Sequence, residues 1–389
     1  MTTGQNPQQI KTESQNNFVY HQPYFLQTTE WAEFWKSVNP IGHKFFWHKS
    51  DIEISKSDET ENITTCETLI YEFPWHLGEK FWYLPKFPLL KQENWENLPS
   101  QTIKNLLTIH LKEIVEEAKK TGIAFVKLDV EEGLTHAIGF ENNDQLLLFI
   151  RENIDQKSQI ATKKIQFLQT ITLDIRNIPN QNLNNIFETK EKNGSFPVDV
   201  LTQFWQECQD FWKATNTNVR RYTKKALSAE WKISTAKTQE NFEKFMDVYN
   251  QTKERQNFVI HSREYMQTLF EDKNIHIIIL TDQQNIPQCV WFGKDWGNTL
   301  IYLFGGNTQY SFDNHGQYLM HLTAIYLAKT LSLDFYDLGG YESGTGYGKF
   351  KENYKGQLRT FLGPIDIPVK PIWYMAVNKI INLAKIFKK

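Results

Sequence analysis

The order of apolar segments between residues 275 and 338 constrains the fold of this chain more than any other feature. Three short apolar runs are joined by polar and Gly-Asn turns, a spacing typical of an antiparallel meander. Gly316–Leu331 then has apolar residues at helical spacing, and Leu333–Leu338 is a further strand. The three runs are Ile275–Thr281, Cys289–Lys294 and Thr299–Phe304. A meander, a buried helix and one more strand predict an α/β domain.

Helix-like segments precede this meander, and Ser262 can cap one that runs through Phe270. The complete order of helices, three antiparallel strands, a helix and a strand is that of an acyltransferase of the GNAT type. In that fold two central strands splay to admit an acyl donor. The other helix-like segments are Leu201–Trp212, Arg220–Leu227 and Asn241–Arg255.

The first half of the chain repeats this order more loosely. A tryptophan-rich helix capped by Thr28 or Thr29 comes first, Ser100 can cap the clearest helix, and Ile123–Asp129 is the next strand. His110 lies on the apolar face of the Ser100 helix, where we favour a hydrogen-bonded core histidine over a ligand. The predicted fold class is α/β (α+β): two GNAT-like acyltransferase domains with mixed or antiparallel sheets and flanking helices. The strand-like runs are Phe45–Lys49, Cys66–Phe73 and Lys80–Leu84.

Length and charge narrow the class of protein. At 389 residues the chain is long enough for two domains. Its net charge of −2 does not mark a general nucleic-acid binder, so any basic surface must be local. Residues 220–263 hold ten Lys/Arg against five Asp/Glu, and residues 342–389 hold nine against three. Three scattered cysteines fit a reducing cytosol, and no apolar run approaches the roughly 20 residues that span a bilayer. We expect a soluble cytoplasmic protein without a DNA partner, preceded by a disordered lead-in at residues 1–17.

The segment Tyr336–Gly363 carries the densest candidate chemistry. It reads YDLGGYESGTGYGKFKENYKGQLRTFLG: a strand end, a glycine-rich turn, and then cationic and aromatic side chains. Glycines allow a backbone to approach a ligand closely, and lysines that follow a fixed strand end suit a phosphate or a developing oxyanion. The alternative is a surface turn with solvated lysines. The cations are Lys349, Lys351, Lys355 and Arg359.

Other motifs bear on the donor and on the type of catalysis. GNAT enzymes that use acyl-CoA hold its pyrophosphate with backbone amides of a glycine-rich loop, whereas residues 314–318 read Asn-His-Gly-Gln-Tyr, so coenzyme A is a poor candidate. RRYTKK at 220–225 could contact a polyphosphate backbone or form a solvated helix face. Arg255 could bind a diphosphate or cap a helix end. The sequence has no Ser-His-Asp, Cys-His or metal-binding pattern, so neither a covalent acyl-enzyme nor a metal is expected.

The C-terminal segment Pro371–Lys389 is amphipathic. We favour packing of its apolar face onto the body of the protein, and contact with an anionic membrane surface is the alternative. The expected apolar face is Trp373, Val377, Ile380, Ile381, Ala384 and Phe387, with Lys379, Lys385, Lys388 and Lys389 beside it.

Taken together, these landmarks resemble the FemABX family of non-ribosomal peptidyltransferases. The matching pieces run in the family's order: TTEWAEFWK, YLPKFP, FVKLD, RRYTKKA, YNQTKERQNF, a strand pair ending YLFGG, and YDLGG followed by GKFKENYKG. Family members are similar to two GNAT-like domains, with a C-terminal segment that returns to the first. The resemblance implies a first domain at 18–164 joined by 365–389, and a second domain at 165–364. It also implies transfer of an amino acid from aminoacyl-tRNA to the side-chain amine of a peptidoglycan precursor's stem peptide.

The resemblance also implies roles for particular residues. Phe350 and Lys351 stand where the family's catalytic pair stands, and Lys351 would stabilise an oxyanion or neutralise the terminal phosphate. Asp129 matches an acidic residue of the acceptor site, and either Asp129 or a substrate carboxylate would accept the amine's proton. The diphosphate of the precursor would meet Lys36 and Arg255. Arg220, Arg221 and Lys224 would face the tRNA.

The implied partners are aminoacyl-tRNA, with no other cofactor, and either UDP-MurNAc-pentapeptide or lipid II. Peripheral contact with the inner membrane surface is the alternative already given for the C-terminal segment. The chain departs from the family pattern near the acceptor groove, where Phe87 replaces a usual glycine and Val130 a usual proline; Tyr354 replaces a common phenylalanine. Two alternatives stay open: an N-acyltransferase with another donor, such as acyl-CoA or acyl carrier protein, and a non-catalytic binder of precursors or tRNA.

Overall fold

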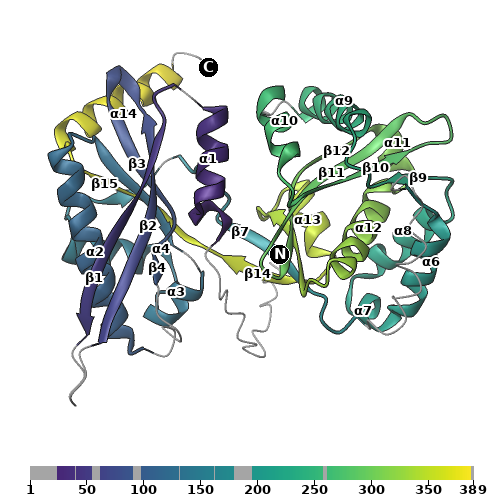
Figure 1. The fold of residues 1–389 in the computed structure, drawn as a ribbon, viewed down its shortest axis with the longest axis horizontal. Helices are drawn as coiled ribbons and strands as arrows, with labels where there is room; N and C mark the ends of the chain where they lie inside the picture. The colour runs from purple at the N-terminus through teal and green to yellow at the C-terminus, as the bar shows by residue number, and fades with distance from the viewer. Residues whose placement is uncertain are drawn as a thin grey trace, which may run out of the picture.

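A computed structural model describes residues 24–39, 41–54, 62–90, 98–130, 132–161, 163–178, 195–256 and 261–386. These residues form two lobes, each built on one β-sheet with helices on its faces (Figure 1). The expected fold class, α/β with mixed sheets and flanking helices, is confirmed. The expected lead-in at 1–17 lies outside the described residues.

The first lobe has the strand order β1-β2-β3-β5-β15-β6, with β4 beside β2. β3 and β5 run parallel, and the other described pairs in this sheet are antiparallel. The strands are β1 (Lys44–Ile54), β2 (Asn62–Pro74), β3 (Lys80–Phe87), β4 (Leu89–Leu90), β5 (Phe125–Val130), β6 (Gln159–Ile160) and β15 (Leu362–Pro368). The helices are η1 (Phe25–Gln27), α1 (Thr29–Val38), η2 (His76–Gly78), α2 (Ser100–Lys120), α3 (Glu132–Ile138), α4 (Asn143–Asn153) and α14 (Pro371–Ile386).

Helix α2 covers one face of this sheet. Its apolar stripe from Ile103 to Ala118 is buried, as its spacing predicts. The expected cap is wrong, because Pro99 occupies the N-cap and the Ser100 hydroxyl donates to the carbonyl of Ile138. His110 is a buried, hydrogen-bonded histidine whose two ring nitrogens lie 2.6 Å from Ser50 Oγ and 2.8 Å from Thr68 Oγ1. The fold also brings ligand atoms of His48, His110 and Glu113 within 4.8 Å of one another, a grouping that sequence spacing does not reveal.

The second lobe has the strand order β14-β7-β13-β12-β11-β10-β9-β8. Helices α6, α8 and α12 pack in the core on one face, and α9 and α10 cover the other. The strands are β7 (Gln169–Asp174), β8 (Ser195–Phe196), β9 (Lys232–Ser234), β10 (Ile275–Thr281), β11 (Pro287–Trp296), β12 (Thr299–Asn307), β13 (Phe335–Gly340) and β14 (Gln357–Thr360). The helices are α6 (Val198–Glu207), α7 (Gln209–Ala214), α8 (Thr217–Leu227), α9 (Gln239–Gln256), α10 (Arg263–Glu271), α11 (Gln309–Asp313), α12 (Gly316–Thr330) and α13 (Gly346–Glu352).

The central strands β12 and β13 separate after a short ladder. They pair in parallel only from Thr299 with Phe335 to Ile301 with Asp337, although both strands continue. The glycine-rich segment after β13, expected to be a turn, contains the helix α13. Its N-cap Thr345 accepts a hydrogen bond from the backbone of Gly348, which starts the helix despite the glycines.

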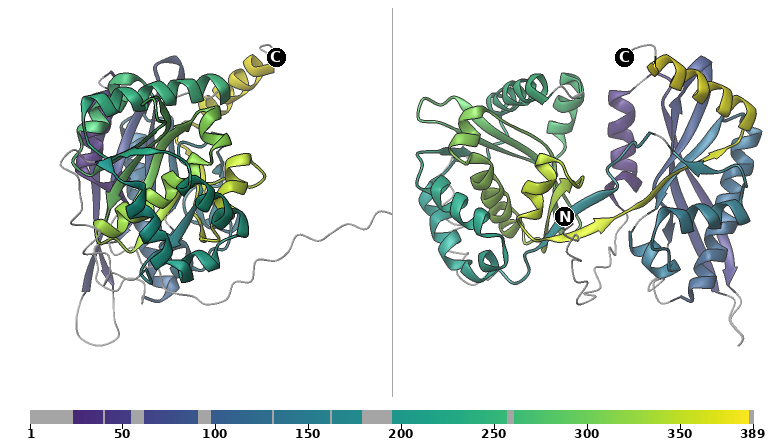
Figure 2. Two further views of the ribbon diagram at one scale, coloured as in Figure 1. Left: turned by 90° about the vertical axis from the view of Figure 1, so that its right-hand side faces the viewer. Right: turned by 180° about the vertical axis from the view of Figure 1, so that it is seen from behind.

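Within the described residues, three connections join the lobes. The chain passes from β6 to β7 and returns from β14 to β15, so the two crossing segments lie side by side between the sheets (Figures 1 and 2). Helices η1 and α1 together form the third connection. Phe25 and Leu26 of η1 pack with Ile301 of β12. Trp31 of α1 packs in the cores of both lobes, and Phe34 contacts Tyr265 of α10 at 5.1 Å. The expected domain limits at 164/165 and 364/365 stay predictions.

Candidate functional site

Lys351 lies in α13, at the end where β12 and β13 have separated. Its side chain is 7% exposed, and Nζ donates a 2.6 Å hydrogen bond to the carbonyl of Gly340, the last residue of β13. The rings of Tyr302 and Tyr347 each lie 5.6 Å from Nζ. A Cβ at Gly348 would come 2.1 Å from the carbonyl oxygen of Glu342, so a glycine is required for α13 to pack this closely on the strand end.

The electrostatic setting brings the Lys351 amine close to neutral pH. Burial lowers its pKa to about 8, and the charge of Asp337 opposes this shift in part. Burial also raises the pKa of the Asp337 carboxyl. The hydrogen bond that Asp337 accepts from the Gly339 N–H at 2.7 Å and the charge of Arg359 lower this pKa and so oppose the effect of burial in part. Lys351 can therefore act as a cation that donates hydrogen bonds and can also lose its proton near physiological pH.

A layer of packed rings supports this end of α13. The Phe350 ring contacts His321 at 5.4 Å and Tyr318 at 5.1 Å. Trp291 Nε1 donates to the Tyr336 hydroxyl oxygen, which leaves the Tyr336 hydrogen to donate to His321 Nδ1 at 2.7 Å. Burial, with the charge of Lys351 as a second cause, lowers the pKa of His321 to about 3, so the imidazole is neutral. The Phe350 carbonyl accepts from the Asn353 N–H at 3.3 Å and closes the helix end.

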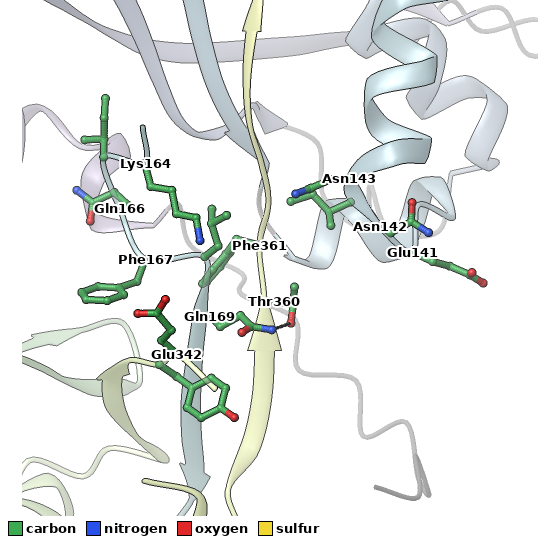
Figure 3. Close-up of a pocket in the computed structure, with 14 residues that line it drawn as sticks. Glu141, Asn142, Asn143, Lys164, Gln166, Phe167, Gln169, Glu342, Thr360 and Phe361 are labelled. Atoms are coloured by element: carbon green, nitrogen blue, oxygen red, sulfur yellow. Dashed lines mark hydrogen bonds between the residues drawn. The ribbon is translucent and has the colours of Figure 1, made fainter. Parts of the chain in front are cut away.

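A pocket of about 520 Å³ opens between the lobes where the two crossing segments lie (Figure 3). Lys164 and Glu342 reach toward it from opposite lobes, and Phe167 forms part of its wall. Two contacts connect the pocket to Lys351. First, Gly340, whose carbonyl accepts from Lys351, lies so close to the pocket residue Phe167 that a Cβ on it would be 2.3 Å from the Phe167 ring. Second, Tyr347, whose ring lies beside Lys351 Nζ, donates through its hydroxyl to the pocket residue Glu342 at 3.0 Å. The other lining residues are Glu141, Asn142, Asn143, Ile165, Gln166, Leu168, Gln169, Tyr341, Thr360, Phe361 and Leu362.

Asp129 lies at the end of β5 in the first lobe, in a different cluster from Lys351. It is 2% exposed, accepts hydrogen bonds from the Tyr83 hydroxyl at 2.5 Å and the Lys86 N–H at 2.8 Å, and pairs with Lys86 Nζ at 3.4 Å. The ring of Phe361, which lines the pocket, lies 3.4 Å from Lys86 Nζ. The carboxylate of Asp129 is thus occupied by groups of its own lobe.

Lys36 and Arg255 are exposed and lie on different elements. Lys36 is on α1 with Nζ 5.7 Å from the Phe45 ring, and Arg255 is near the end of α9 with its guanidinium 5.0 Å from the Phe312 ring. Both are accessible to a ligand, and their expected role as a joint diphosphate site stays a prediction.

The three cations of α8 that the resemblance directs toward tRNA have different surroundings. The Arg220 guanidinium donates to the carbonyls of Thr215, Lys213 and Trp212 and so closes the C-terminal end of α7. Arg221 and Lys224 are exposed. Arg220 is therefore engaged in structure, whereas Arg221 and Lys224 are available to a polyanion.

Comparison with known proteins supports the fold described above. Residues 213–356, which include α8, α9, the meander, α12 and α13, match the model of the acetyltransferase (GNAT) domain. The match identifies an acetyltransferase (GNAT) domain within the second lobe, whose strand order and helices agree with it. A crystal structure of FemX is similar at a TM-score of 0.58 with 15% identity, over 90% of this chain and 94% of that chain. The resemblance to FemABX proteins is thus confirmed at the level of the fold.

Two further solved structures are similar at lower TM-scores. L-PGS from Bacillus licheniformis has a TM-score of 0.42 and 10% identity, over 80% of this chain and 85% of that chain. A tandem GNAT protein from the clavulanic acid biosynthesis pathway has a TM-score of 0.44 and 8% identity, over 79% and 83%. A search of curated proteins found no significant match.

Sequence reasoning missed most of the groups around Lys351 and the pocket. Asp337 and Glu342 lie within the segment Tyr336–Gly363 that the sequence analysis identified, so their closeness to Lys351 in the chain could have indicated them. Tyr302 and Lys164 carry no local signal, because they reach the site only through the separation of β12 from β13 and through the crossing between lobes.

Proposed function

We propose that this protein is an aminoacyltransferase that moves an amino acid from aminoacyl-tRNA to the side-chain amine of a peptidoglycan precursor's stem peptide. The observation that carries the proposal is the Lys351 amine, buried at the separated strand ends and held by the Gly340 carbonyl. This lysine stands where the FemABX resemblance locates the catalytic Phe-Lys pair. The tRNA is the co-substrate, and no other cofactor is required.

The chemistry needs positioning more than covalent catalysis. The unprotonated acceptor amine attacks the ester carbonyl, a C–N bond forms, the C–O bond to the ribose breaks, and the ribose oxygen takes up a proton. The Lys351 ammonium is suited to stabilise the oxyanion of the tetrahedral intermediate or the nearby terminal phosphate. The Phe350 carbonyl already accepts from Asn353, and its second lone pair could orient the incoming amine.

Glu342 is a better candidate than Asp129 to accept the proton of the amine. Asp129 is buried and paired with Lys86, whereas Glu342 lines the pocket and connects through the Tyr347 hydroxyl to the surroundings of Lys351. We therefore assign Asp129 to shaping the first-lobe wall of the acceptor site, beneath Phe361.

The remaining surfaces fit the two large substrates. The pocket between the lobes would receive the stem peptide of UDP-MurNAc-pentapeptide or lipid II, and the exposed Lys36 and Arg255 would meet its diphosphate. Arg221 and Lys224 would contact the tRNA backbone, since exposed cations supply affinity for phosphates without sequence specificity.

A GNAT N-acyltransferase with another acyl donor is the second candidate. The match of residues 213–356 to an acetyltransferase domain favours it. The start of α12 weighs against acyl-CoA, because His315 occupies the N-cap where a glycine-rich phosphate loop would be needed. Saturable binding of coenzyme A in a titration would favour this candidate over the first.

The decisive experiment measures transfer of radiolabel from a mixed pool of aminoacylated tRNA to lysine-containing UDP-MurNAc-pentapeptide and to lipid II. Lys351→Ala should fold normally and lower transfer about 100-fold or more, as losses of single oxyanion donors do. Lys349→Ala is the matched control, because Lys349 is an exposed lysine of the same helix. Absence of transfer to both acceptors with folded wild-type protein would refute the proposal, and equal transfer by the two variants would remove Lys351 from its role.

A further inference from the structure

Exposed apolar side chains gather at one end of the first lobe. Among the described residues, the five most exposed large hydrophobic side chains are Ile41 (87%), Ile372 (82%), Leu77 (71%), Met375 (60%) and Ile380 (59%). We call these five residues the apolar end. Contiguous exposed apolar surface of this kind marks interaction sites, whereas single exposed residues are ordinary.

The five residues come from three segments that pack against one another. Gly42, next to Ile41, lies against Pro74 at the end of β2, where a Cβ on the glycine would be 3.7 Å from the proline Cβ. The ring of Trp75, in the turn that carries Leu77, stacks on Tyr374 of α14 at 5.9 Å. Figures 1 and 2 show α14 lying across the end of the sheet where β2 turns into β3.

Over residues 371–380, whose side chains the structure describes, helix α14 is anchored by one of its sides. Tyr374 and Val377 are buried, and the Tyr374 hydroxyl donates to Asp366 at 2.5 Å. Trp373 and Ile380, which the sequence predicted to pack inward with Val377, are exposed instead. The expected packing of α14 onto the protein is therefore correct, but the expected face is wrong in part, and an apolar side is left facing outward.

The charge around the apolar end is basic. Lys44 and Lys379 are exposed there. The acidic groups of the β2–β3 turn region are neutralised, since Glu72 pairs with Lys80 at 2.6 Å and Glu79 with Lys370 at 2.7 Å. Cations beside an apolar helix side are the signature of helices that lie in the plane of an anionic membrane surface.

We propose that the apolar end docks on an anionic phospholipid bilayer, with α14 lying in the interface and Ile41 and Leu77 dipping in beside it. Within the described residues, no helix is long and apolar enough to cross a bilayer. The 16 residues of α14 are suited to contact with one leaflet. The proposal rests on this surface alone and is independent of the proposed aminoacyl transfer.

Flotation of the full chain with vesicles tests the proposal. Vesicles of phosphatidylcholine with about 30% phosphatidylglycerol should bind the protein, more weakly as salt rises, whereas pure phosphatidylcholine should bind little. Ile372→Ser/Ile380→Ser should weaken binding about tenfold or more, because both side chains are exposed and the fold does not need them. Leu148→Ser/Ile286→Ser removes two exposed apolar side chains elsewhere (56% and 54% exposed) and should bind as wild type.

Three outcomes would overturn the proposal. The first is no binding of folded wild-type protein to anionic vesicles. The second is equal binding by the wild type and by Ile372→Ser/Ile380→Ser. The third is a wild-type dimer in sedimentation that the same variant converts to monomer while vesicle binding is absent, because the apolar end would then be an interface between copies of the chain. The vesicles contain no precursor, so none of these results depends on the transfer reaction.

Discussion

Replacing Lys351 by methionine should change how the stability of the protein depends on pH. The folded state lowers the pKa of this amine to about 8 from its ordinary value of 10.5, mainly through burial. Between these two pH values the unfolded chain binds more protons at this site than the folded protein does. The free energy of unfolding of the wild type therefore rises with pH in this window, and the rise is complete above the unfolded pKa.

The size of the effect follows from the two pKa values. Linkage gives a gain of about 2 kcal/mol in the free energy of unfolding of the wild type between pH 7 and pH 9.5. Methionine has a similar length and does not titrate, so Lys351→Met lacks this gain. Other titrating groups are common to both proteins and cancel when the two pH profiles are subtracted.

Urea unfolding of both proteins at several pH values between 7 and 9.5 measures the difference. Lys349→Met serves as the control, since Lys349 is exposed on the same helix and its variant should follow the wild-type profile. Parallel profiles for the wild type and Lys351→Met would refute the reasoning. A difference of opposite sign would mean that Asp337 stabilises the ammonium by more than burial destabilises it.

Three further predictions concern residues at the margins of the site. Asp129→Asn should lower the free energy of unfolding by about 3–5 kcal/mol, because it removes the buried carboxylate that pairs with Lys86 Nζ at 3.4 Å. Asp129→Asn/Lys86→Met should recover part of this loss in urea unfolding, and a loss below about 1 kcal/mol in the single variant would contradict the assignment. Arg220→Met should lower the free energy of unfolding by about 1–3 kcal/mol, because it removes the hydrogen bonds that close the C-terminal end of α7. Arg221→Met should leave thermal unfolding unchanged and weaken tRNA binding at low salt. The reverse pattern would show that Arg220 is the RNA contact. Trp31→Ala should lower the free energy of unfolding by about 3–5 kcal/mol, because the Trp31 ring packs with both lobes. Glu33→Ala, on the exposed side of α1, should leave it unchanged. Equal effects of the two variants in chemical denaturation would exclude a bridging role for Trp31.

Local patterns predicted the elements of this fold well. β10 spans Ile275–Thr281 and α12 begins at Gly316, as periodicity and turn residues indicate. The helix α13 was not predicted, because its glycines hide it and a single threonine cap starts it. For α14 the sequence has apolar residues on more than one side, and periodicity alone cannot tell which side finds a partner.

The candidate site was predicted only in outline. The resemblance to FemABX proteins pointed to Lys351, but the burial that lowers its pKa depends on contacts with β12 and β13. The pocket depends on where two distant crossing segments meet. Sequence alone also cannot distinguish Arg220 from Arg221, because both belong to one charged run. In the structure the Arg220 guanidinium hydrogen-bonds to the end of α7. Contacts between elements, rather than composition, decide which cations are free to bind.

The place of β15 has a consequence for the synthesis of this protein. This strand pairs with β5 and β6 in the first sheet, although it follows the entire second lobe in the chain. During translation the other strands of the first sheet leave the ribosome long before it, so β5 carries an open edge while the second lobe is being made. The first lobe can close its sheet only when Leu362–Pro368 has emerged. Folding of the lobe that is synthesised first is therefore completed last, and a nascent chain that stalls before β15 would expose an aggregation-prone strand edge.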